Sequence, residues 1–274
     1  MNKKNGTLSA KFEEAYDSMS IIPQERDSDE MTFFLNLIAG TGFKKVLDLG
    51  CAEGKFSILL AQNGYKVTAS DISGRFLELL KKGAKEKNLS IKTVKCDIEK
   101  GVSSFGEERY DVIYFTDVIE HLRNVPVGLE NIRKILRDDG VLIINTPNVL
   151  TVSRLLRAII KRKKLINYHD PSNLGDLHFS TFDYQTLEKT LNSQGFKVTE
   201  VVPTKLSFPK MSEIGFMQPF YRLLARIFPF LSDNLCLKCV KTEPIDLLKT
   251  VEFWDNKYNK KSTRKLNSEE NTNE

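Results

Sequence analysis

The chain has 274 residues, of which 41% are hydrophobic and 28% are charged, a balance typical of a globular protein with room for one α/β domain and additions. Its net charge of +5 is modest, so charge alone does not indicate nucleic acid as a partner. No stretch approaches the roughly 18 uninterrupted apolar residues of a membrane span. The amino-terminal residues lack the apolar core of a signal peptide, so we expect a cytoplasmic protein.

Segments with strand character and segments with helix character alternate along most of the chain. Strands are predicted at residues 44–50, 65–71, 90–96, 110–116, 141–145, 196–202 and 235–240. Helices are predicted at residues 31–39, 55–63, 76–87, 125–136 and 182–194. This alternation predicts an α/β fold with a doubly wound, mostly parallel seven-stranded sheet and helical cap insertions. Right-handed crossovers place the carboxyl ends of parallel strands at one edge, where we expect ligands.

The chain divides into three parts by composition. Residues 1–30 are expected to form a helical amino-terminal segment, and residues 31–240 form the α/β domain. Two cap insertions are expected within the domain, at residues 150–180 and 204–233. Residues 241–274 are polar and mixed in charge, so we expect a largely disordered tail.

The most informative stretch is residues 46–54, VLDLGCAEG, where an apolar strand runs into a glycine turn before a helix. Gly50 and Gly54 permit a tight turn, and the helix start presents free N–H groups. The middle glycine of a dinucleotide-binding turn is missing, and Glu53 would repel a pyrophosphate. The turn therefore favours a cofactor without phosphates, although a purely structural glycine turn is the alternative.

Polar residues lie at the carboxyl ends of five apolar strands. They are Asp48 with Gly50, Asp71, Asp97, Thr116 with Asp117, and Thr146 with Asn148. A loop edge in contact with solvent could also be polar, but the regularity of this pattern favours a binding site at the carboxyl edge of the sheet.

The strand–loop–helix at residues 46–60 resembles motif I of class I S-adenosylmethionine (SAM) dependent methyltransferases. The resemblance spans roughly residues 31–202 and is strongest to the group with ubiquinone-type enzymes and the methyltransferase-domain 11 and 23 families. It implies SAM as cofactor, with Asp71 accepting the ribose hydroxyls and Asp97 contacting the adenine between Ile72 and Ile98. The cofactor-binding residues implied are Asp48, Gly50, Cys51, Ala52, Gly54, Asp71, Ile72, Asp97, Ile98 and Thr116.

Residues 111–122, DVIYFTDVIEHL, resemble motif IV of ubiquinone-type O-methyltransferases and of small-RNA 2′-O-methyltransferases. In those enzymes an acid-x-x-Glu-His pattern with a later histidine is associated with a divalent metal. The resemblance implies Asp117, Glu120 and His121 as catalytic residues and, together with His178, as ligands of Mg²⁺ or Mn²⁺. Asp117 departs from the pattern, because the metal enzymes usually have glutamate there.

Three interpretations of this segment remain open from the sequence. A metal at these residues would lower the pKa of an acceptor hydroxyl. His121 could act instead as a general base without a metal. Glu120 and His121 could also be a structural pair at the start of a helix.

Two insertions bear on the acceptor. Residues 153–164 are basic around an apolar stripe, and residues 204–232 are rich in aromatic residues and proline. Helical caps that pack on the domain explain each one taken singly. Together they favour a small or lipid-linked acceptor and peripheral contact with a membrane surface. Nucleic acid is the less favoured partner, because no recognition module is visible.

The sequence therefore predicts a SAM-dependent methyltransferase that acts on a hydroxyl of a small or lipid-linked acceptor, such as a sugar or a quinone precursor. One alternative is an RNA ribose 2′-O-methyltransferase. Another is a noncatalytic protein with the same fold that binds a partner through residues 204–232.

Overall fold

The computed structural model describes residues 28–151, 154, 155, 159, 178–204, 223, 224 and 226–244. Residues 1–27 of the expected helical segment, most of both cap insertions and residues 245–274 of the expected tail lie outside the described residues.

Seven strands form one sheet in the order β3-β2-β1-β4-β5-β7-β6. The strands are β1 Lys45–Leu49, β2 Lys66–Asp71, β3 Lys92–Lys95, β4 Tyr110–Thr116, β5 Leu136–Pro147, β6 Phe196–Val202 and β7 Asn234–Lys241. The pairs from β3 across to β5 are parallel, and β7 runs antiparallel to both β5 and β6. The predicted doubly wound, mostly parallel sheet is confirmed.

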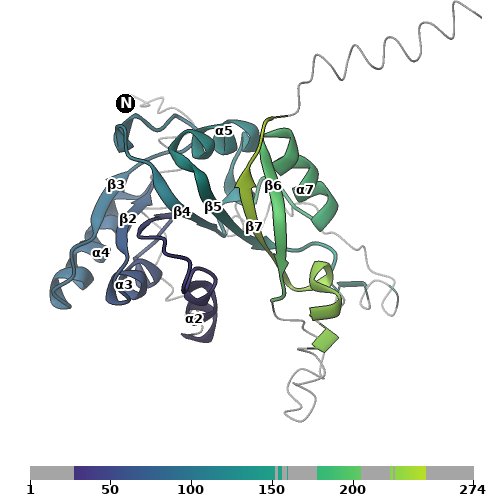
Figure 1. Ribbon diagram of the computed structural model, residues 1–274, viewed down its shortest axis with the longest axis horizontal. Coiled ribbons are helices and arrows are strands. Elements are labelled where there is room, and N and C mark those ends of the chain that lie inside the picture. The colour runs from purple at the N-terminus through teal and green to yellow at the C-terminus, as the bar shows by residue number, and fades with distance from the viewer. Residues whose placement is uncertain are drawn as a thin grey trace, which may run out of the picture.

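Helices cover both faces of this sheet. They are α2 Ser28–Asn36, α3 Lys55–Gln62, α4 Gly74–Glu86, α5 Val125–Ile135 and α7 Tyr184–Ser193. Figure 1 shows α2, α3 and α4 together at the lower left and α5 and α7 at the top and right. Alternation along β4 explains the two layers, because Val112 and Tyr114 pack with residues of α2 and α3, whereas Ile113 and Phe115 pack with residues of α5 and α7.

The largest difference from the predicted elements lies at residues 136–140, which were expected as a helix end and a turn. They belong to β5, which begins at Leu136. Leu136 pairs with Tyr110 and Val141 with Val112, so residues 137–140 bulge opposite the single residue Asp111. Gly140 permits this bulge, because a Cβ there would lie 3.0 Å from the carbonyl oxygen of Asp111.

Strands β6 and β7 form an antiparallel pair at one side of the sheet. Because β6 runs parallel to β5, it ends at the carboxyl edge, and β7 begins at the same edge. Within β7, Cys236 packs in the core on the α2 and α3 side and Cys239 in the core on the α5 and α7 side. Burial raises the pKa of both thiols, so both cysteines are neutral side chains of the core.

In the part of the chain that the structure describes, no helix has the length and apolar character needed to cross a membrane.

Two glycines allow close packing around the turn after β1. Gly50 and Gly54 have φ angles of 83° and 80°, a left-handed conformation that L side chains rarely adopt. A Cβ on Gly50 would lie 2.2 Å from Cγ2 of Val118, and one on Gly54 would lie 2.1 Å from Cδ1 of Leu80. The glycines therefore make room for the protein's own side chains, and the turn after β1 touches the turn after β4.

This contact can be tested by comparing Gly50→Ala with Gly64→Ala. Gly64 has nearly the same φ, 82°, but nothing lies within 4 Å of its hypothetical Cβ. We expect Gly64→Ala to cost about 1–2 kcal/mol of unfolding free energy from backbone strain alone. Gly50→Ala should cost at least about 2 kcal/mol more, because β-branched Val118 has little freedom to move.

Urea unfolding of both variants measures the difference. The double variant Gly50→Ala/Val118→Ala should recover part of the additional loss. Equal losses for Gly50→Ala and Gly64→Ala would contradict the close contact.

Candidate functional site

The turn after β1 is held against the end of β2 by hydrogen bonds. The N–H groups of Gly50 and Cys51 donate to the carbonyl oxygen of Ser70, at 2.7 and 3.0 Å. Ala52, with a left-handed φ of 46°, donates its N–H to Oδ2 of Asp71 at 2.9 Å. These bonds fix the turn at the carboxyl edge, where the sequence predicts the cofactor.

Asp71 is buried at the end of β2, with 8% of its surface exposed. Its Oδ2 accepts the Ala52 N–H, and its Oδ1 accepts the Ser73 N–H at 2.8 Å. Burial raises the pKa of this carboxyl, the Ser73 and Ala52 bonds lower it and the nearby Asp48 raises it, with a net pKa of about 6. Each oxygen retains a second lone pair, so the ionised form can still accept two O–H groups from a ligand.

Asp48 is buried within the same edge. Its Oδ2 accepts the hydroxyl of Ser57 on α3 at 2.6 Å, so it ties the strand end to the helix that follows the turn. The Cys51 thiol lies close by, and burial raises its pKa well above the usual value, with Asp48 and Asp71 adding to the effect. Cys51 is therefore a neutral thiol at physiological pH.

The predicted adenine-side residues differ in their surroundings. The Asp97 Oδ1 accepts the Glu99 N–H at 3.1 Å, and its Oδ2 lies 3.5 Å from the Lys100 ammonium. Ile98 is 5% exposed and belongs to the core beside α5, whereas Ile72 is half-buried. Ile72 is thus better exposed than Ile98 for contact with a flat ring.

Three of the predicted acceptor-side residues come together. One ligand atom from each of Glu120, His121 and His178 lies within 4.8 Å of the others. The two imidazole rings pack edge to face, with centroids 4.7 Å apart. Glu120 and His121 belong to the 3₁₀ turn η2, Ile119–His121, which follows β4. His178 belongs to a segment that comes much later in the chain.

Glu120 is anchored by its side chain and by its backbone. Its Oε2 accepts the hydroxyl of Thr146 at 2.9 Å, and its carbonyl oxygen accepts the N–H groups of Phe179 and Ser180 at 2.8 and 3.1 Å. The latter bonds hold the segment with His178 against η2. Burial and, less strongly, Asp117 raise the pKa of Glu120, whereas the Thr146 bond and His178 lower it, and the net pKa is about 7.

Asp117 lies outside this group of three. It follows Thr116, the buried last residue of β4, and has a left-handed φ of 56°, so no right-handed helical turn begins at this residue. Its N–H donates to the carbonyl oxygen of Asn145 at 2.8 Å, and its Oδ1 accepts the amide N–H of Asn145 at 3.0 Å. The structure therefore pairs Asp117 with β5.

The sequence reasoning missed the residues that hold the acids and the turn after β1 in place: Ser57, Ser70, Ser73, Asn145 and Thr146. Each forms a hydrogen bond to a predicted site residue or to that turn, through its side chain, its carbonyl oxygen or, for Ser73, its backbone N–H. Thr146 was predicted as a polar residue at the end of a strand, but its bond to Glu120 was not predicted. The serines carry no signal that distinguishes them from ordinary polar residues.

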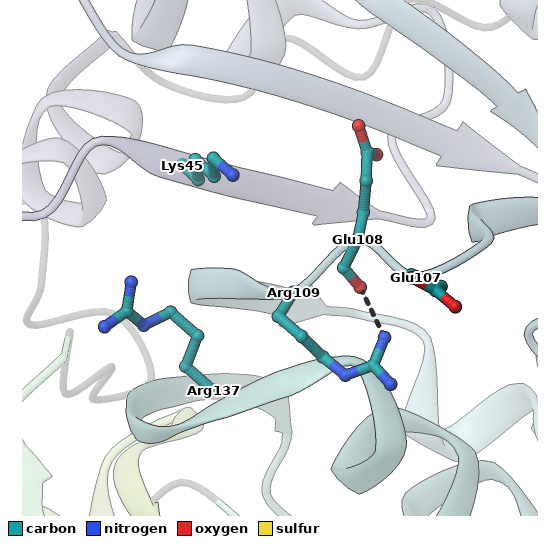
Figure 2. A pocket seen from close by; sticks show the side chains of 5 residues that line it. All are labelled: Lys45, Glu107, Glu108, Arg109 and Arg137. Atoms are coloured by element: carbon teal, nitrogen blue, oxygen red, sulfur yellow. Dashed lines mark hydrogen bonds between the residues drawn. The ribbon is translucent and has the colours of Figure 1, made fainter.

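A hollow of about 570 Å³ lies at the opposite edge of the sheet. Figure 2 shows its lining, with Lys45 on β1, Arg137 on β5 and residues 107–109 before β4. The Arg109 guanidinium donates to the Glu108 carbonyl oxygen at 2.9 Å. This hollow is at the amino ends of the strands, so it has no part in the predicted site.

Comparison with known proteins bears on the family and the fold. A family model described as a methyltransferase domain matches residues 24–201. Ubiquinone biosynthesis O-methyltransferase from Rickettsia akari is 36% identical over 104 residues, which cover 38% of this chain and 40% of the relative. The Rickettsia bellii enzyme of the same name is 30% identical over 151 residues, 53% of this chain and 60% of the relative. The chain thus spans about half the length of these relatives.

Solved structures extend the likeness to the fold. A SAM-dependent methyltransferase from Clostridium acetobutylicum aligns with a TM-score of 0.56 at 14% identity, covering 86% of this chain and 100% of that one. The N-methyltransferase NodS from Bradyrhizobium japonicum aligns with a TM-score of 0.55 at 17% identity, with the same coverage. These identities are low, so the likeness shows the fold alone. With the family match over residues 24–201, it establishes that the chain belongs to the methyltransferase domain family and has the class I SAM-dependent methyltransferase fold.

Proposed function

We propose that the protein is a SAM-dependent O-methyltransferase that methylates a hydroxyl of a quinone precursor, an aromatic acceptor that carries an apolar tail. The observation that carries the proposal is the cluster of Glu120, His121 and His178. This cluster lies at the turn after β4, beside the turn that follows β1. The relatives named ubiquinone biosynthesis O-methyltransferase support this acceptor class.

The donors and acceptors at the carboxyl edge suit SAM. Asp71 has lone pairs for ribose hydroxyls, and the buried acids would repel phosphate but attract a cation. Besides Asp71, the residues proposed for SAM are those named from the sequence: Asp48, Gly50, Cys51, Ala52, Gly54, Ile72, Asp97, Ile98 and Thr116. SAM supplies a methyl group on a positively charged sulfur, so no further activation of the donor is needed.

The acceptor side must hold a hydroxyl and remove its proton. Glu120, His121 and His178 offer one carboxylate oxygen and two imidazole nitrogens within 4.8 Å of one another, a mixed donor set that can hold a divalent transition metal, so it fits Mn²⁺ better than Mg²⁺. These three residues would hold the metal, which lowers the pKa of a bound hydroxyl. Asp117 would contribute from its position beside Asn145. Without a metal, His121 would accept the proton at an imidazole nitrogen, and Glu120 would stabilise the resulting charge.

An apolar rim suits a tailed acceptor. Leu150, Phe228 and Phe230 are each about two-fifths exposed, at 38%, 42% and 44%. The amide of Asn148 joins their segments, because it donates to the carbonyl oxygens of Leu150 and Phe230 at 3.3 and 2.9 Å. Since Asn148 follows β5, the rim lies at the carboxyl edge.

Peripheral membrane contact through residues 153–164 and 204–232 stays a prediction for this edge. Most of those residues lie outside the described ones. Binding to anionic vesicles but not to neutral ones would support it, and binding to neither kind of vesicle would contradict it.

The first prediction from the proposed function concerns the pH dependence of SAM binding. Ribose hydroxyls need an ionised Asp71, whose pKa is raised to about 6. Affinity should therefore be constant above pH 7, and well below pH 6 the Kd should rise about tenfold for each pH unit as Asp71 becomes protonated. Calorimetric titration of the wild type with SAM measures this dependence.

Asp71→Asn is the decisive variant. It should bind SAM much more weakly at pH 7.5 and should lose the rise in Kd below pH 6, whereas Asp139→Asn, an exposed acid on β5, should behave like the wild type. Unchanged affinity in Asp71→Asn would contradict the proposed role of Asp71, and a wild type that does not bind SAM would contradict the whole proposal.

The second prediction concerns methyl transfer to a catechol with a short prenyl tail. Glu120→Gln and His178→Asn should lower kcat at least about 100-fold, while the Kd for SAM changes less than twofold. A chelator should abolish turnover by the wild type, and Mn²⁺ or Mg²⁺ should restore it. Turnover that is insensitive to the chelator would reject the metal and leave His121 as the general base.

The third prediction concerns the apolar rim. Phe228→Ser/Phe230→Ser should raise the KM for the tailed catechol several-fold, because about half of each ring is already buried and the tail would bury more. The KM for an untailed catechol should not change, which serves as the control. An equal rise for both substrates would indicate a general structural effect.

The two alternative functions have distinct outcomes. Methylation of the 3′-terminal ribose of a small RNA, with no transfer to catechols or sugars, would favour the RNA ribose 2′-O-methyltransferase. SAM binding without transfer to a catechol, a sugar or an RNA would favour the noncatalytic protein.

A further inference from the structure

Two consecutive polar residues, Asn145 and Thr146, lie near the end of β5 and have 0% of their surfaces exposed. Successive side chains on a strand point to opposite faces of the sheet. Ile143 accordingly packs on the α2 and α3 side and Ile144 on the α5 and α7 side. Asn145 thus belongs to the first face and Thr146 to the second, yet both side chains bond to the turn after β4.

Asn145 forms two hydrogen bonds with Asp117, one through its backbone and one through its side chain. The backbone N–H of Asp117 donates to the carbonyl oxygen of Asn145 at 2.8 Å, and Nδ2 of Asn145 donates to Oδ1 of Asp117 at 3.0 Å. Among the described residues, Oδ1 of Asn145 has no hydrogen-bond partner although it is buried. Burying an unpaired carbonyl oxygen is unfavourable, so the amide is kept at this position at some cost in stability.

Thr146 forms a hydrogen bond to the same turn from the other face of the sheet. Its hydroxyl donates to Oε2 of Glu120 at 2.9 Å. Glu120 is 2% exposed, so this bond contributes much of the polar surroundings of its carboxylate. The carboxylate rotates less freely when one oxygen is held, and the other oxygen then has a fixed direction.

We propose that Asn145 and Thr146 are positioning residues, which hold the turn at residues 117–121 from both faces of the sheet and set the directions of the Asp117 and Glu120 carboxylates. The inference rests on the proposed function, in which those carboxylates serve the acceptor. Consecutive residues on one rigid strand are suited to this task, because neither can move without the other.

Two substitutions at Thr146 provide the first test. Thr146→Val keeps the shape and removes the hydroxyl, and Thr146→Ser keeps the hydroxyl and removes a methyl group. With the tailed catechol, Thr146→Val should lower kcat about ten- to a hundredfold, and Thr146→Ser should stay within about threefold of the wild type. The Kd for SAM should change less than twofold in both, which shows that the variants are folded.

Double-mutant cycles provide the second test. In the Glu120→Gln background, Thr146→Val should have little further effect on kcat, because the bond it removes no longer serves an ionised carboxylate. Asn145→Leu should behave likewise in an Asp117→Asn background. The crossed pairs, Asn145 with Glu120 and Thr146 with Asp117, are the matched controls and should show weaker coupling.

The outcomes separate the inference from the proposed function. A wild type that does not methylate the catechol overturns the proposed function and, with it, the inference. A wild type that does, with Thr146→Val equally active, overturns the inference alone. The inference also fails when Thr146→Ser is as impaired as Thr146→Val, or when matched and crossed pairs couple equally.

Discussion

The close approach of Gly50 and Val118 constrains how the two turns of the carboxyl edge that carry predicted site residues can lie. It joins the turn after β1 to the turn after β4, and a single methyl group on Gly50 would overlap the Val118 side chain. The two turns lie where the strand order reverses direction from β1, with β2 on one side and β4 on the other. One turn belongs to the proposed SAM site and the other to the proposed acceptor site, so under the proposed function the methyl donor and the acceptor would meet at this contact.

Around that contact the protein accumulates buried acids that disfavour one another's ionisation. Asp48 raises the pKa of Asp71, and Asp117 raises that of Glu120. Such crowding costs stability unless a positive charge arrives to offset it. A sulfonium ion and a divalent metal both carry that charge. The crowded acids therefore lower the stability of the ligand-free protein, and binding of a positively charged ligand would reduce this loss.

Most of the fold was predictable because it follows from short-range patterns. Buried strands such as β4 are continuous apolar runs, and the turn at Gly50 and Gly54 requires glycine. The bulge at residues 137–140 was not predictable, because it depends on pairing with Asp111, far away along the chain. The sequence did indicate Glu120, His121 and His178. It did not indicate the bond between Asp117 and Asn145, because these two residues are also far apart along the chain. A left-handed aspartate has no local sequence signal.

The antiparallel pair of β6 and β7 has a consequence for how this protein can diversify. The connection between them leaves and returns at the carboxyl edge, beside the acceptor rim and away from the turn after β1. The entropy of closing such a connection grows only slowly with its length. Evolution can therefore lengthen, shorten or replace residues 203–233 and, under the proposed function, exchange one acceptor for another while the proposed SAM site is inherited unchanged.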